Sequence, residues 1–324
     1  MKQFFENEQK IVCHDLAQSV FQTLTSLQRS IPTVFLYDAL GSRLFEKITQ
    51  LPEYYPSRLE INLLTKLGAD YLKKFENCDI VDLGSGNCSK ICCLFNNMDY
   101  SGFSSLRYVP FDVSWEILLE SAKLLISRFP QLNVHALEGD FLTQLHLLPS
   151  GRKKLVCFFG STIGNFESGQ RVSFLSDLSK QMKEGDNLLL GVDLVKPMNV
   201  LERAYNDSGN VTALFNLNIL NSVNALTGSD FNTALFRHVA YYNEELSRVE
   251  MYLEALESMA IHSPAFPRDV KISKGERIHT ENSHKFTIVQ IADEAECAGL
   301  TVESLYTDNN KWYSLVEMKK GGDV

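Results

Sequence analysis

The sequence predicts an α/β protein, in which a mostly parallel sheet with helices on its faces is accompanied by a second, smaller lobe. From residue 79 onward, short uninterrupted apolar segments alternate with helical segments, which is typical of a buried parallel sheet. After about residue 197 this alternation stops, and it resumes only near residue 285. The interruption indicates an insertion into the sheet domain.

The N-terminal 75 residues are predicted to be helical, with helices over 7–28, 42–49 and 57–75. Between the last two helices, the segment LPEYYPSR contains Pro52 and Pro56, which favour an irregular turn. We expect 1–56 and 197–284 to form the smaller, substrate-binding lobe, and 57–196 and 285–324 to form the sheet domain. A small substrate is commonly bound in a cleft between two such lobes.

Five strands are predicted in the sheet domain, followed by a closing hairpin. The strands are DIVDLGSG, LRYVPFDVS, NVHALEGDF, KLVCFFGST and DNLLLGVDLV. Helices are predicted over 89–95, from a cap at Ser114 to about 129, and over 168–182. Within the insertion, helices over 200–205 and 211–225 precede strand-like segments; beyond it lie a helix over 285–299 and the hairpin TVESLYTDNNKWYSLVEMK.

Composition excludes several classes of function. The 324 residues carry 31 Lys and Arg against 40 Asp and Glu, a net charge of −9, which argues against nucleic acid as a substrate. The apolar segments are too short to span a bilayer, and no secretion signal is recognised. Seven scattered cysteines predict reduced thiols in the cytoplasm. Cys88, Cys92 and Cys93 are expected to pack in a helix core rather than to bind a metal.

The exits of the first two predicted strands carry residues suited to a nucleoside. Gly84 and Gly86 allow a ligand to approach the backbone closely, although the third glycine of a dinucleotide-binding loop is replaced by Ser89. Asp112, after the second strand, can accept hydrogen bonds from both ribose hydroxyls. It can equally be an acid in the first turn of a helix.

After the third strand, Asp140 can accept a hydrogen bond from an adenine amino group, and Phe141 can lie against the ring. A plain turn is the alternative at this position. Because the three signals follow three successive strands in the order that an adenosine ligand requires, together they predict an adenosine-containing ligand. The closing hairpin supplies the antiparallel last strand usual in class I methyltransferases.

Segments along most of the chain carry a family resemblance. They are FLYDALGSRLFEKITQLPEYYPSR, IVDLGSGNCSK, YVPFDVS, FFGSTIGNF, LLLGVDLVK and TENSHKF. These segments closely resemble the histidine-specific Nα-methyltransferases of ergothioneine biosynthesis, from about residue 32 to the closing hairpin. The resemblance implies a class I (Rossmann-like) methyltransferase fold and S-adenosyl-L-methionine as methyl donor. It also implies trimethylation of L-histidine at its α-nitrogen to hercynine.

The resemblance also implies roles for individual residues, in a protein that we expect to be monomeric. The cofactor would be bound by Tyr37, Gly84, Lys90, Asp112, Asp140 and Phe141. The amino acid would be bound by Tyr54, Asn165, Tyr205, Met251, Glu281 and Ser283. Gly160 and Thr162 would lie near the transferred methyl group, and Asn165 would orient the amine. No catalytic base, nucleophile or metal is implied, because the methyl group is already activated on the sulfonium.

The chemistry of Glu281 and Ser283 agrees with an imidazole ligand. A carboxylate and a hydroxyl two residues apart on an extended segment can bond both ring nitrogens. Without the resemblance, Glu281 would be interpreted as a solvated surface acid, and Asn165 as a turn residue. Tyr54, Tyr205 and Met251 would then be core or rim residues. Asn282 stands between Glu281 and Ser283 where a small aliphatic residue is usual in the family, and Leu40 stands where an arginine is common.

Two other functions remain open from the sequence. The first is methylation of another amino acid, or of an indole-type amine, by an enzyme of the same family. Glu281 and Ser283 argue against it, since burying an unpaired carboxylate against an apolar ring is costly. The second is a non-catalytic protein that binds adenosylmethionine.

Overall fold

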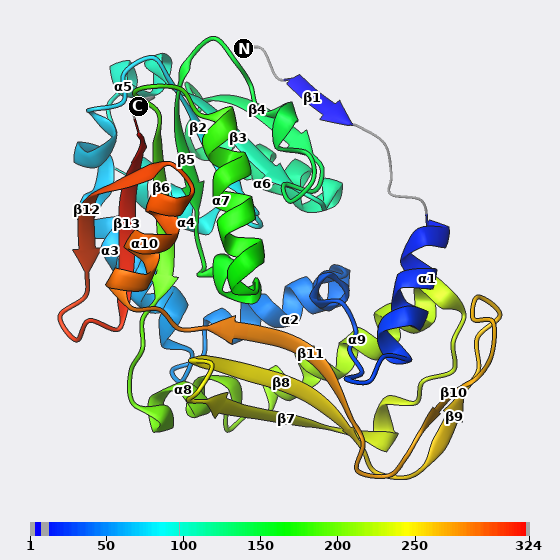
Figure 1. The fold of residues 1–324 in the computed structure, drawn as a ribbon. Helices are drawn as coiled ribbons and strands as arrows, with labels where there is room; N and C mark the ends of the chain where they lie inside the picture. Colours follow the sequence, from blue (N-terminus) through cyan, green and yellow to red (C-terminus); the bar gives the residue numbers. More distant parts are fainter. Residues whose placement is uncertain (1–3, 8–12, 97, 322–324) are drawn as a thin grey trace. The chain divides into compact units, whose positions relative to one another are not determined.

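The computed structural model describes residues 4–7, 13–96 and 98–321, and the chain divides into two compact units (Figure 1). The first unit comprises Met1–Gln9, Arg58–Val195 and Phe286–Val324. The second unit comprises Lys10–Ser57 and Lys196–Lys285. The chain therefore leaves the first unit after Val195 and returns to it at Phe286.

Among the described residues of the first unit, eight strands form one sheet in the order β1-β4-β3-β2-β5-β6-β13-β12. Neighbours from β1 to β6 are parallel, whereas β13 runs antiparallel to both β6 and β12. The strands are β1 (Phe4–Asn7), β2 (Cys78–Leu83), β3 (Arg107–Asp112), β4 (Asn133–Glu138), β5 (Lys153–Phe158), β6 (Asn187–Asp193), β12 (Leu300–Thr307) and β13 (Tyr313–Lys320). The predicted α/β class, with a mostly parallel sheet, is confirmed.

The N-terminal strand β1 is a correction to the sequence analysis. Helix was predicted from residue 7 onward, with residues 1–56 in the smaller lobe; instead, β1 pairs in parallel with β4, placing Phe4 opposite His135. Four residues are too few for a hydrophobic period to distinguish strand from helix, so the pairing partner decides. The first helix begins at Cys13, and residues 8–12 of its predicted span lie outside the described residues.

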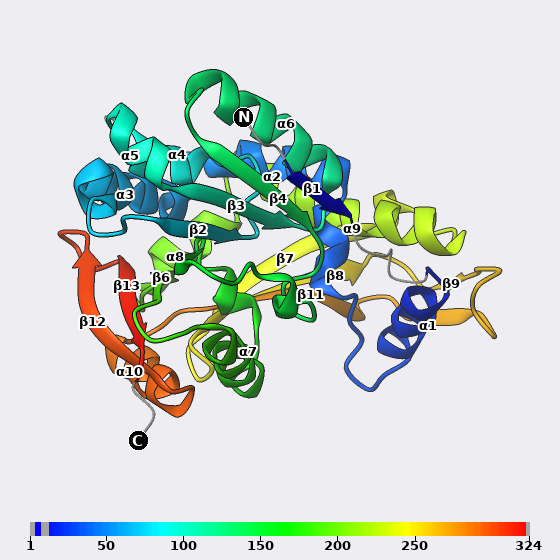
Figure 2. The ribbon, with the colours of Figure 1, turned by 90° about the horizontal axis from the view of Figure 1, so that it is seen from above.

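Helices cover both faces of the sheet (Figure 2). They are α3 (Tyr55–Leu72, broken at Gly68), α4 (Ser89–Phe95), α5 (Tyr100–Ser105), α6 (Trp115–Arg128), α7 (Ser168–Gln181) and α10 (Ile288–Cys297), with short 3₁₀ segments η2 (Leu145–Leu147) and η3 (Thr162–Asn165). Ile80 and Tyr108 pack in a core with α3, α4 and α6, whereas their neighbours Val81 and Val109 pack with α7 and α10. Successive strand residues point to opposite faces, so both faces must be apolar.

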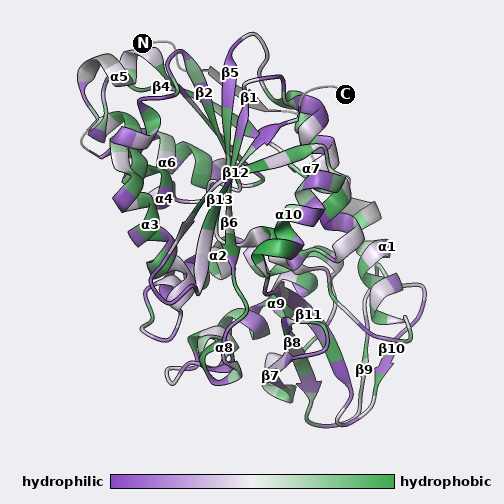
Figure 3. Cartoon of the chain, turned by 60° about the vertical axis from the view of Figure 1, so that its left-hand side comes forward, coloured by the Kyte–Doolittle hydropathy of each residue, from purple (hydrophilic) through white to green (hydrophobic). Residues whose placement is uncertain are grey.

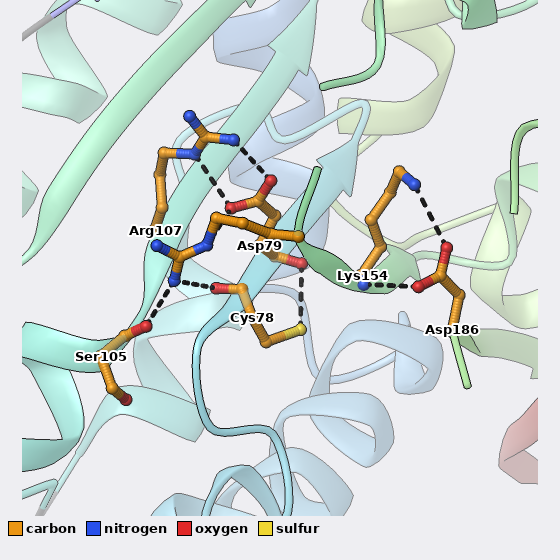
Figure 4. A network of polar contacts seen from close by, with 7 residues as sticks. Cys78, Asp79, Ser105, Arg107, Lys154 and Asp186 are labelled. Atoms are coloured by element: carbon orange, nitrogen blue, oxygen red, sulfur yellow. Dashed lines mark hydrogen bonds and ion pairs between the residues drawn. The ribbon is translucent and has the colours of Figure 1, made fainter. Parts of the chain in front are cut away.

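Ion pairs fix the amino-terminal ends of the parallel strands (Figure 4). Arg107 of β3 donates two hydrogen bonds to the buried carboxylate of Asp79 on β2, at 2.9 and 2.5 Å. Arg152 pairs with the same carboxylate at 3.0 Å, and Lys154 of β5 pairs with Asp186 at 3.2 Å. These charges stabilise the sheet at the end opposite to the carboxyl edge, where the ligand-binding residues were predicted.

The second unit contains a three-stranded antiparallel sheet in the order β11-β8-β7. Its helical segments are α1 (Cys13–Leu24), η1 (Thr33–Tyr37), α2 (Ala39–Thr49), α8 (Met198–Tyr205), α9 (Val211–Thr227) and η4 (Thr233–Leu235). Its strands are β7 (Phe236–Asn243), β8 (Arg248–Ala255), β9 (Met259–Ile261), β10 (Val270–Ile272) and β11 (Arg277–His284). Helix α9 packs against α2, η1 and β7. Along these helices and strands, hydrophobic and hydrophilic residues stand side by side, as expected of elements with one buried face (Figure 3).

Helices α2, α3 and α10 begin at other residues than predicted, each for a local reason. Helix α2 begins at Ala39 rather than 42, because the Asp38 carboxylate accepts a hydrogen bond from the backbone N–H of Gly41 at 2.6 Å. Helix α3 begins at Tyr55 rather than 57, since proline is tolerated in a first helical turn. Helix α10 begins at Ile288 rather than 285, because Thr287 provides its cap.

Candidate active site

The loop after β2 places a glycine beneath an aromatic ring. Gly84 has a φ of +67°, which favours glycine, and a Cβ added to it would lie 3.5 Å from Cε1 of Phe141. The Phe141 ring packs edge-on against Phe158 and Phe174, with centroids at 5.4 and 6.0 Å. The structure thus brings together Gly84 and Phe141, two residues predicted to bind the cofactor.

Asp112, the last residue of β3, joins this loop to the start of α6. Its carboxylate accepts hydrogen bonds from the backbone N–H of Gly86 at 3.0 Å and of Ser114 at 3.1 Å. Burial raises the pKa of the Asp112 carboxyl group, and these hydrogen bonds act in the opposite direction. The carboxylate therefore shapes the glycine loop and the helix start, while its remaining lone pairs can accept from a ligand.

Further polar groups lie at the carboxyl ends of β2 and β4. Asp140 Oδ1 accepts a hydrogen bond from the backbone N–H of Leu142 at 2.8 Å, so the turn proposed as its alternative role is present. Glu138 Oε2 and the Ser85 hydroxyl are buried and have no hydrogen-bond partner among the described residues. Buried polar atoms are normally paired. This edge therefore fits a ligand with hydroxyl and amino groups, such as a nucleoside.

Glu60 of α3, which the sequence analysis missed, links two predicted site residues of the first unit. Its fully buried carboxylate accepts hydrogen bonds from the backbone N–H of Gly160, at 2.8 and 3.0 Å, and from Tyr313 Oη at 2.7 Å. The ammonium of Lys90 pairs with it at 2.9 Å. A glutamate within a helix carries no local signal of such a role, because all three partners come from distant parts of the chain.

Gly160, Thr162 and Asn165 lie on one short segment after β5. Gly160 has a φ of +81°, and Thr162 Oγ1 donates a hydrogen bond to the carbonyl of Phe159 at 3.0 Å. Thr162 and Asn165 are the first and last residues of η3. The structure therefore groups the three residues that were predicted to position the methyl group and the amine.

In the second unit, Glu281 and Ser283 lie on the same face of β11, because side chains two residues apart in a strand point the same way. They are 6% and 8% exposed. Met251 of β8 is directly opposite Glu281 in the register and shares this face. Asn282 points to the other face, where its Oδ1 lies 2.8 Å from Nε2 of His279. Its amide is thereby directed away from Glu281 and Ser283.

Tyrosines and a lysine contact the Glu281 and Ser283 side chains. Tyr205 Oη donates a hydrogen bond to Ser283 Oγ at 2.7 Å, and Tyr37 Oη donates to Glu281 Oε1 at 3.4 Å. Burial, followed by the Glu281 charge, raises the pKa of Tyr37 well above its usual range. Lys285 Nζ donates to Ser283 Oγ at 2.7 Å and to Tyr205 Oη at 3.0 Å.

The predicted substrate residues of this unit thus form one group, with Tyr54 against the ring of Tyr205 at a centroid distance of 6.2 Å. Tyr37, predicted for the cofactor, contacts Glu281 of this group. Lys285 was missed, although it lies within the TENSHKF segment.

Two further properties of the described residues bear on other functions. Over that part of the chain, no group of three or more His, Cys, Asp and Glu side chains is arranged to hold a metal ion. Cys92 and Cys93 of α4, and Cys88 at its N-cap, are buried in the core, as expected. Within the same residues, no helix combines the length and apolar character needed to cross a membrane.

Comparison with known proteins adds independent evidence. Residues 16–320 match the family described as histidine-specific, S-adenosylmethionine-dependent methyltransferase. The chain is 38% identical over 293 residues to the histidine N-alpha-methyltransferase of Mycobacterium tuberculosis (strain CDC 1551 / Oshkosh), covering 90% of this chain and 91% of that protein. It is 28% identical to ergothioneine biosynthesis protein 1 of Neurospora crassa, covering 88% of this chain and 32% of that protein.

A solved structure supports the fold. The PH0226 protein of Pyrococcus horikoshii OT3 is similar at a TM-score of 0.50 and 14% identity, over 88% of this chain and 100% of that one. The family match spans nearly all of both units described above. The chain belongs to the family of S-adenosylmethionine-dependent, histidine-specific methyltransferases.

Proposed function

We propose that this protein transfers methyl groups from S-adenosyl-L-methionine to the α-amino nitrogen of L-histidine, yielding hercynine for ergothioneine biosynthesis. The observation that carries this proposal is the pair of buried polar side chains, Glu281 and Ser283, on one face of β11. A carboxylate beside a hydroxyl complements the two nitrogens of an imidazole. The family membership supports the reaction class.

The first unit is proposed to bind the methyl donor. Phe141 above Gly84 would contact the adenine ring, Asp140 its amino group, and Asp112 the ribose hydroxyls. Lys90 is the further cofactor residue of this unit, and Glu60 fixes its ammonium beside Gly160. When bound, adenosylmethionine supplies a methyl group already activated by a sulfonium.

The second unit is proposed to bind histidine. Tyr54 and Tyr205 would hold the carboxylate, Glu281 and Ser283 the ring nitrogens, and Met251 would pack beside the ring. Tyr37, next to Glu281, would serve the cofactor as well as orient that carboxylate. Asn165 would orient the lone pair of the amine.

The work of the protein in this reaction is positioning. Holding an amine in line with the bond to be broken can contribute roughly 7–11 kcal/mol. An α-amino group with a pKa of about 8 is only about a tenth neutral at pH 7, a cost on the order of 1 kcal/mol. A desolvated site favours the neutral amine, so Asn165, Gly160 and Thr162 are assigned positioning roles and no residue is assigned as a base.

The contacts disfavour the two alternatives. An indole ring offers one N–H and no acceptor nitrogen, so the hydroxyl proton of Ser283 would find no acceptor on the ring, which costs about 1–3 kcal/mol. A protein that only binds adenosylmethionine would not need the group of Tyr54, Tyr205, Glu281 and Ser283 beside Met251.

A methyl-transfer assay tests the proposal. The protein is incubated with adenosylmethionine and a panel of amino acids, and products are analysed by mass spectrometry and NMR. We expect histidine to gain three methyl groups, all on the α-nitrogen. Methylation of tryptophan in preference to histidine would favour the indole alternative. No mass gain with any amino acid would favour a binding protein, and a methyl group on the imidazole would overturn the proposed orientation.

The site of action and assembly belong to the same proposal. Buried free thiols at Cys78, Cys88 and Cys157 are compatible with a reducing compartment, and we place the enzyme in the cytoplasm. With a net charge of −9, it is proposed to act on a small molecule and not on nucleic acid. A monomer is the proposed state, which light scattering would check.

A further inference from the structure

Lys285 is a buried cation in direct contact with two residues of the proposed histidine site. It is 1% exposed and follows the last residue of β11. Its Nζ donates to Ser283 Oγ at 2.7 Å and to Tyr205 Oη at 3.0 Å, and it lies 5.0 Å from the centroid of the Tyr205 ring. Burying an ammonium group is costly unless it is hydrogen-bonded, so its placement against these hydroxyls needs a reason.

The hydrogen-bonding capacity of the three groups restricts where their protons can point. An ammonium group has donors and no acceptor, whereas each hydroxyl has one donor proton. Both hydroxyl oxygens must therefore accept from Lys285. The proton of Tyr205 points to Ser283 in the structure, at 2.7 Å. Ser283 Oγ then accepts two hydrogen bonds, and its own proton is left to donate elsewhere.

We propose that Lys285 is a positioning residue that fixes Ser283 as a hydrogen-bond donor toward the substrate ring, so that the site selects a neutral imidazole. This inference rests on the proposed function, because it takes Ser283 as a contact of the ring. With Glu281 as acceptor and Ser283 as donor, the face of β11 matches a ring that has one N–H and one acceptor nitrogen. An imidazolium ion has two N–H groups and no acceptor, so it cannot take the hydrogen bond of Ser283.

The same argument applies to Tyr205. The Tyr205 oxygen accepts a hydrogen bond from Lys285. The Tyr205 proton can therefore turn from Ser283 to a substrate carboxylate while the oxygen keeps a hydrogen-bond donor. Lys285 thus lets both hydroxyls donate to the substrate at the same time. Without it, Ser283 can rotate to accept from the ring, and Glu281 would then favour the charged imidazolium.

The experiment uses ring pairs that differ only in an acceptor nitrogen. Thiazol-4-ylalanine is compared with thien-3-ylalanine, and thiazol-5-ylalanine with thien-2-ylalanine, so that each imidazole nitrogen position is probed by one pair. These rings are neutral at pH 7. Dissociation constants are measured by calorimetry on the full chain with S-adenosylhomocysteine present. In the wild type, one thiazole should bind about 3- to 10-fold more tightly than its thiophene partner, the effect of one neutral hydrogen bond.

Lys285→Met should reduce this ratio to below about 2-fold, because the Ser283 hydroxyl loses the charged donor that polarises its O–H bond and orients it toward the ring. Lys285→Arg, whose guanidinium also only donates, should retain it. Lys285→Gln is a second variant should the methionine protein not fold: its carbonyl can accept from Ser283, so the ratio should also fall. Lys196→Met is the matched control, since Lys196 is a buried lysine of the same unit that donates to Tyr55 Oη at 2.9 Å; it should leave the ratio unchanged.

A general loss of stability would weaken both members of a pair equally, so the ratio separates positioning from a structural role. The proposal is overturned if the wild type shows no thiazole preference in either pair. It is also overturned if the preference persists in folded Lys285→Met or Lys285→Gln protein. Failure of the wild type to methylate histidine would instead refute the proposed function, whatever the binding ratios show.

Discussion

The carboxylate of Glu60 accepts hydrogen bonds from the backbone N–H of Gly160, at 2.8 and 3.0 Å, one hundred residues further along the chain. It also pairs with Lys90 at 2.9 Å. A residue of helix α3 therefore sets the position of the segment after β5, in which Gly160 has a positive φ. The proposed methyl-transfer residues therefore depend on a side chain that was not among the predicted ligand contacts.

Replacing Glu60 should accordingly affect both stability and catalysis. Glu60→Ala leaves the Gly160 N–H and the Tyr313 hydroxyl without their acceptor, at about 1–3 kcal/mol for each group. Glu60→Gln keeps an acceptor but loses the charge, so its effect should be smaller. Urea unfolding and steady-state kinetics would check this, and kcat should fall more than KM for histidine rises. Wild-type stability together with wild-type kcat in Glu60→Ala would contradict the role.

Asp112 is expected to contribute to cofactor binding. Asp112→Ala should weaken adenosylmethionine binding by about 1–3 kcal/mol, through loss of the ribose hydrogen bonds. Since Asp112 also holds the Gly86 loop, the comparison of methylthioadenosine with its 2′-deoxy analogue separates the two roles. If Asp112 contacts the ribose, the wild type should prefer methylthioadenosine over the 2′-deoxy analogue more strongly than Asp112→Ala does. If Asp112 only holds the loop, the preference should be the same in both proteins. Calorimetry that finds unchanged cofactor affinity in folded Asp112→Ala protein would remove this residue from the site.

Substrate choice should depend on Glu281. A site built to bond polar ring atoms can reject a ligand without them on the order of 10⁴-fold. Glu281→Ala should therefore lower kcat/KM for histidine strongly and leave adenosylmethionine affinity nearly intact. Met251 lies opposite Glu281 in the sheet, so adding the smaller side chain of Met251→Val should leave more space for the substrate ring. The double variant should therefore shift its preference toward tryptophan. Glu281→Gln, which keeps an acceptor oxygen, is the matched control. Wild-type histidine kinetics in the double variant would refute the assignment.

Asp82 predicts a pH dependence of stability. Burial raises the pKa of this carboxyl group to about 7 from its usual 3.8, against the opposing hydrogen bond from Tyr108 at 2.8 Å. The folded protein therefore binds a proton that the unfolded chain has lost, and the free energy of unfolding falls as pH rises from about 4 to about 7. The difference between the two pKa values corresponds to a decrease in the free energy of unfolding of at most roughly 4 kcal/mol.

Asp82→Asn removes this proton linkage. The variant should gain stability relative to the wild type as pH rises from 5 to 7, and the difference should level off above pH 7. Urea unfolding at half-unit pH intervals measures it, with Asp186→Asn as a control, since Asp186 pairs with Lys154 far from the carboxyl edge. Parallel curves for Asp82→Asn and wild type would show that Asp82 titrates as an ordinary carboxyl group.

The sequence by itself determined the parallel strands β2 to β6 and the residues that stand at their carboxyl ends, where a ligand was predicted. Strands buried on both faces must be continuously apolar, so β2 to β6 are visible as apolar segments. Residues directly after such strands, such as Gly84, Asp112 and Asp140, fall at one edge whatever the details of packing. The strand period likewise places Glu281 and Ser283 on one face and Asn282 on the other.

The tertiary structure decided the features that depend on partners distant in sequence. The four residues of β1 have no period of their own, and they form a strand because β4 offers a free edge. Glu60 lies in a helix whose local pattern is the same whether its carboxylate meets water or Gly160. Nothing in the local sequence distinguishes Lys285 from a surface lysine, because its partner Tyr205 lies eighty residues away in the chain. Local periodicity shows which side of a helix or strand is buried. Which residues pack against that side depends on contacts between segments far apart in the chain.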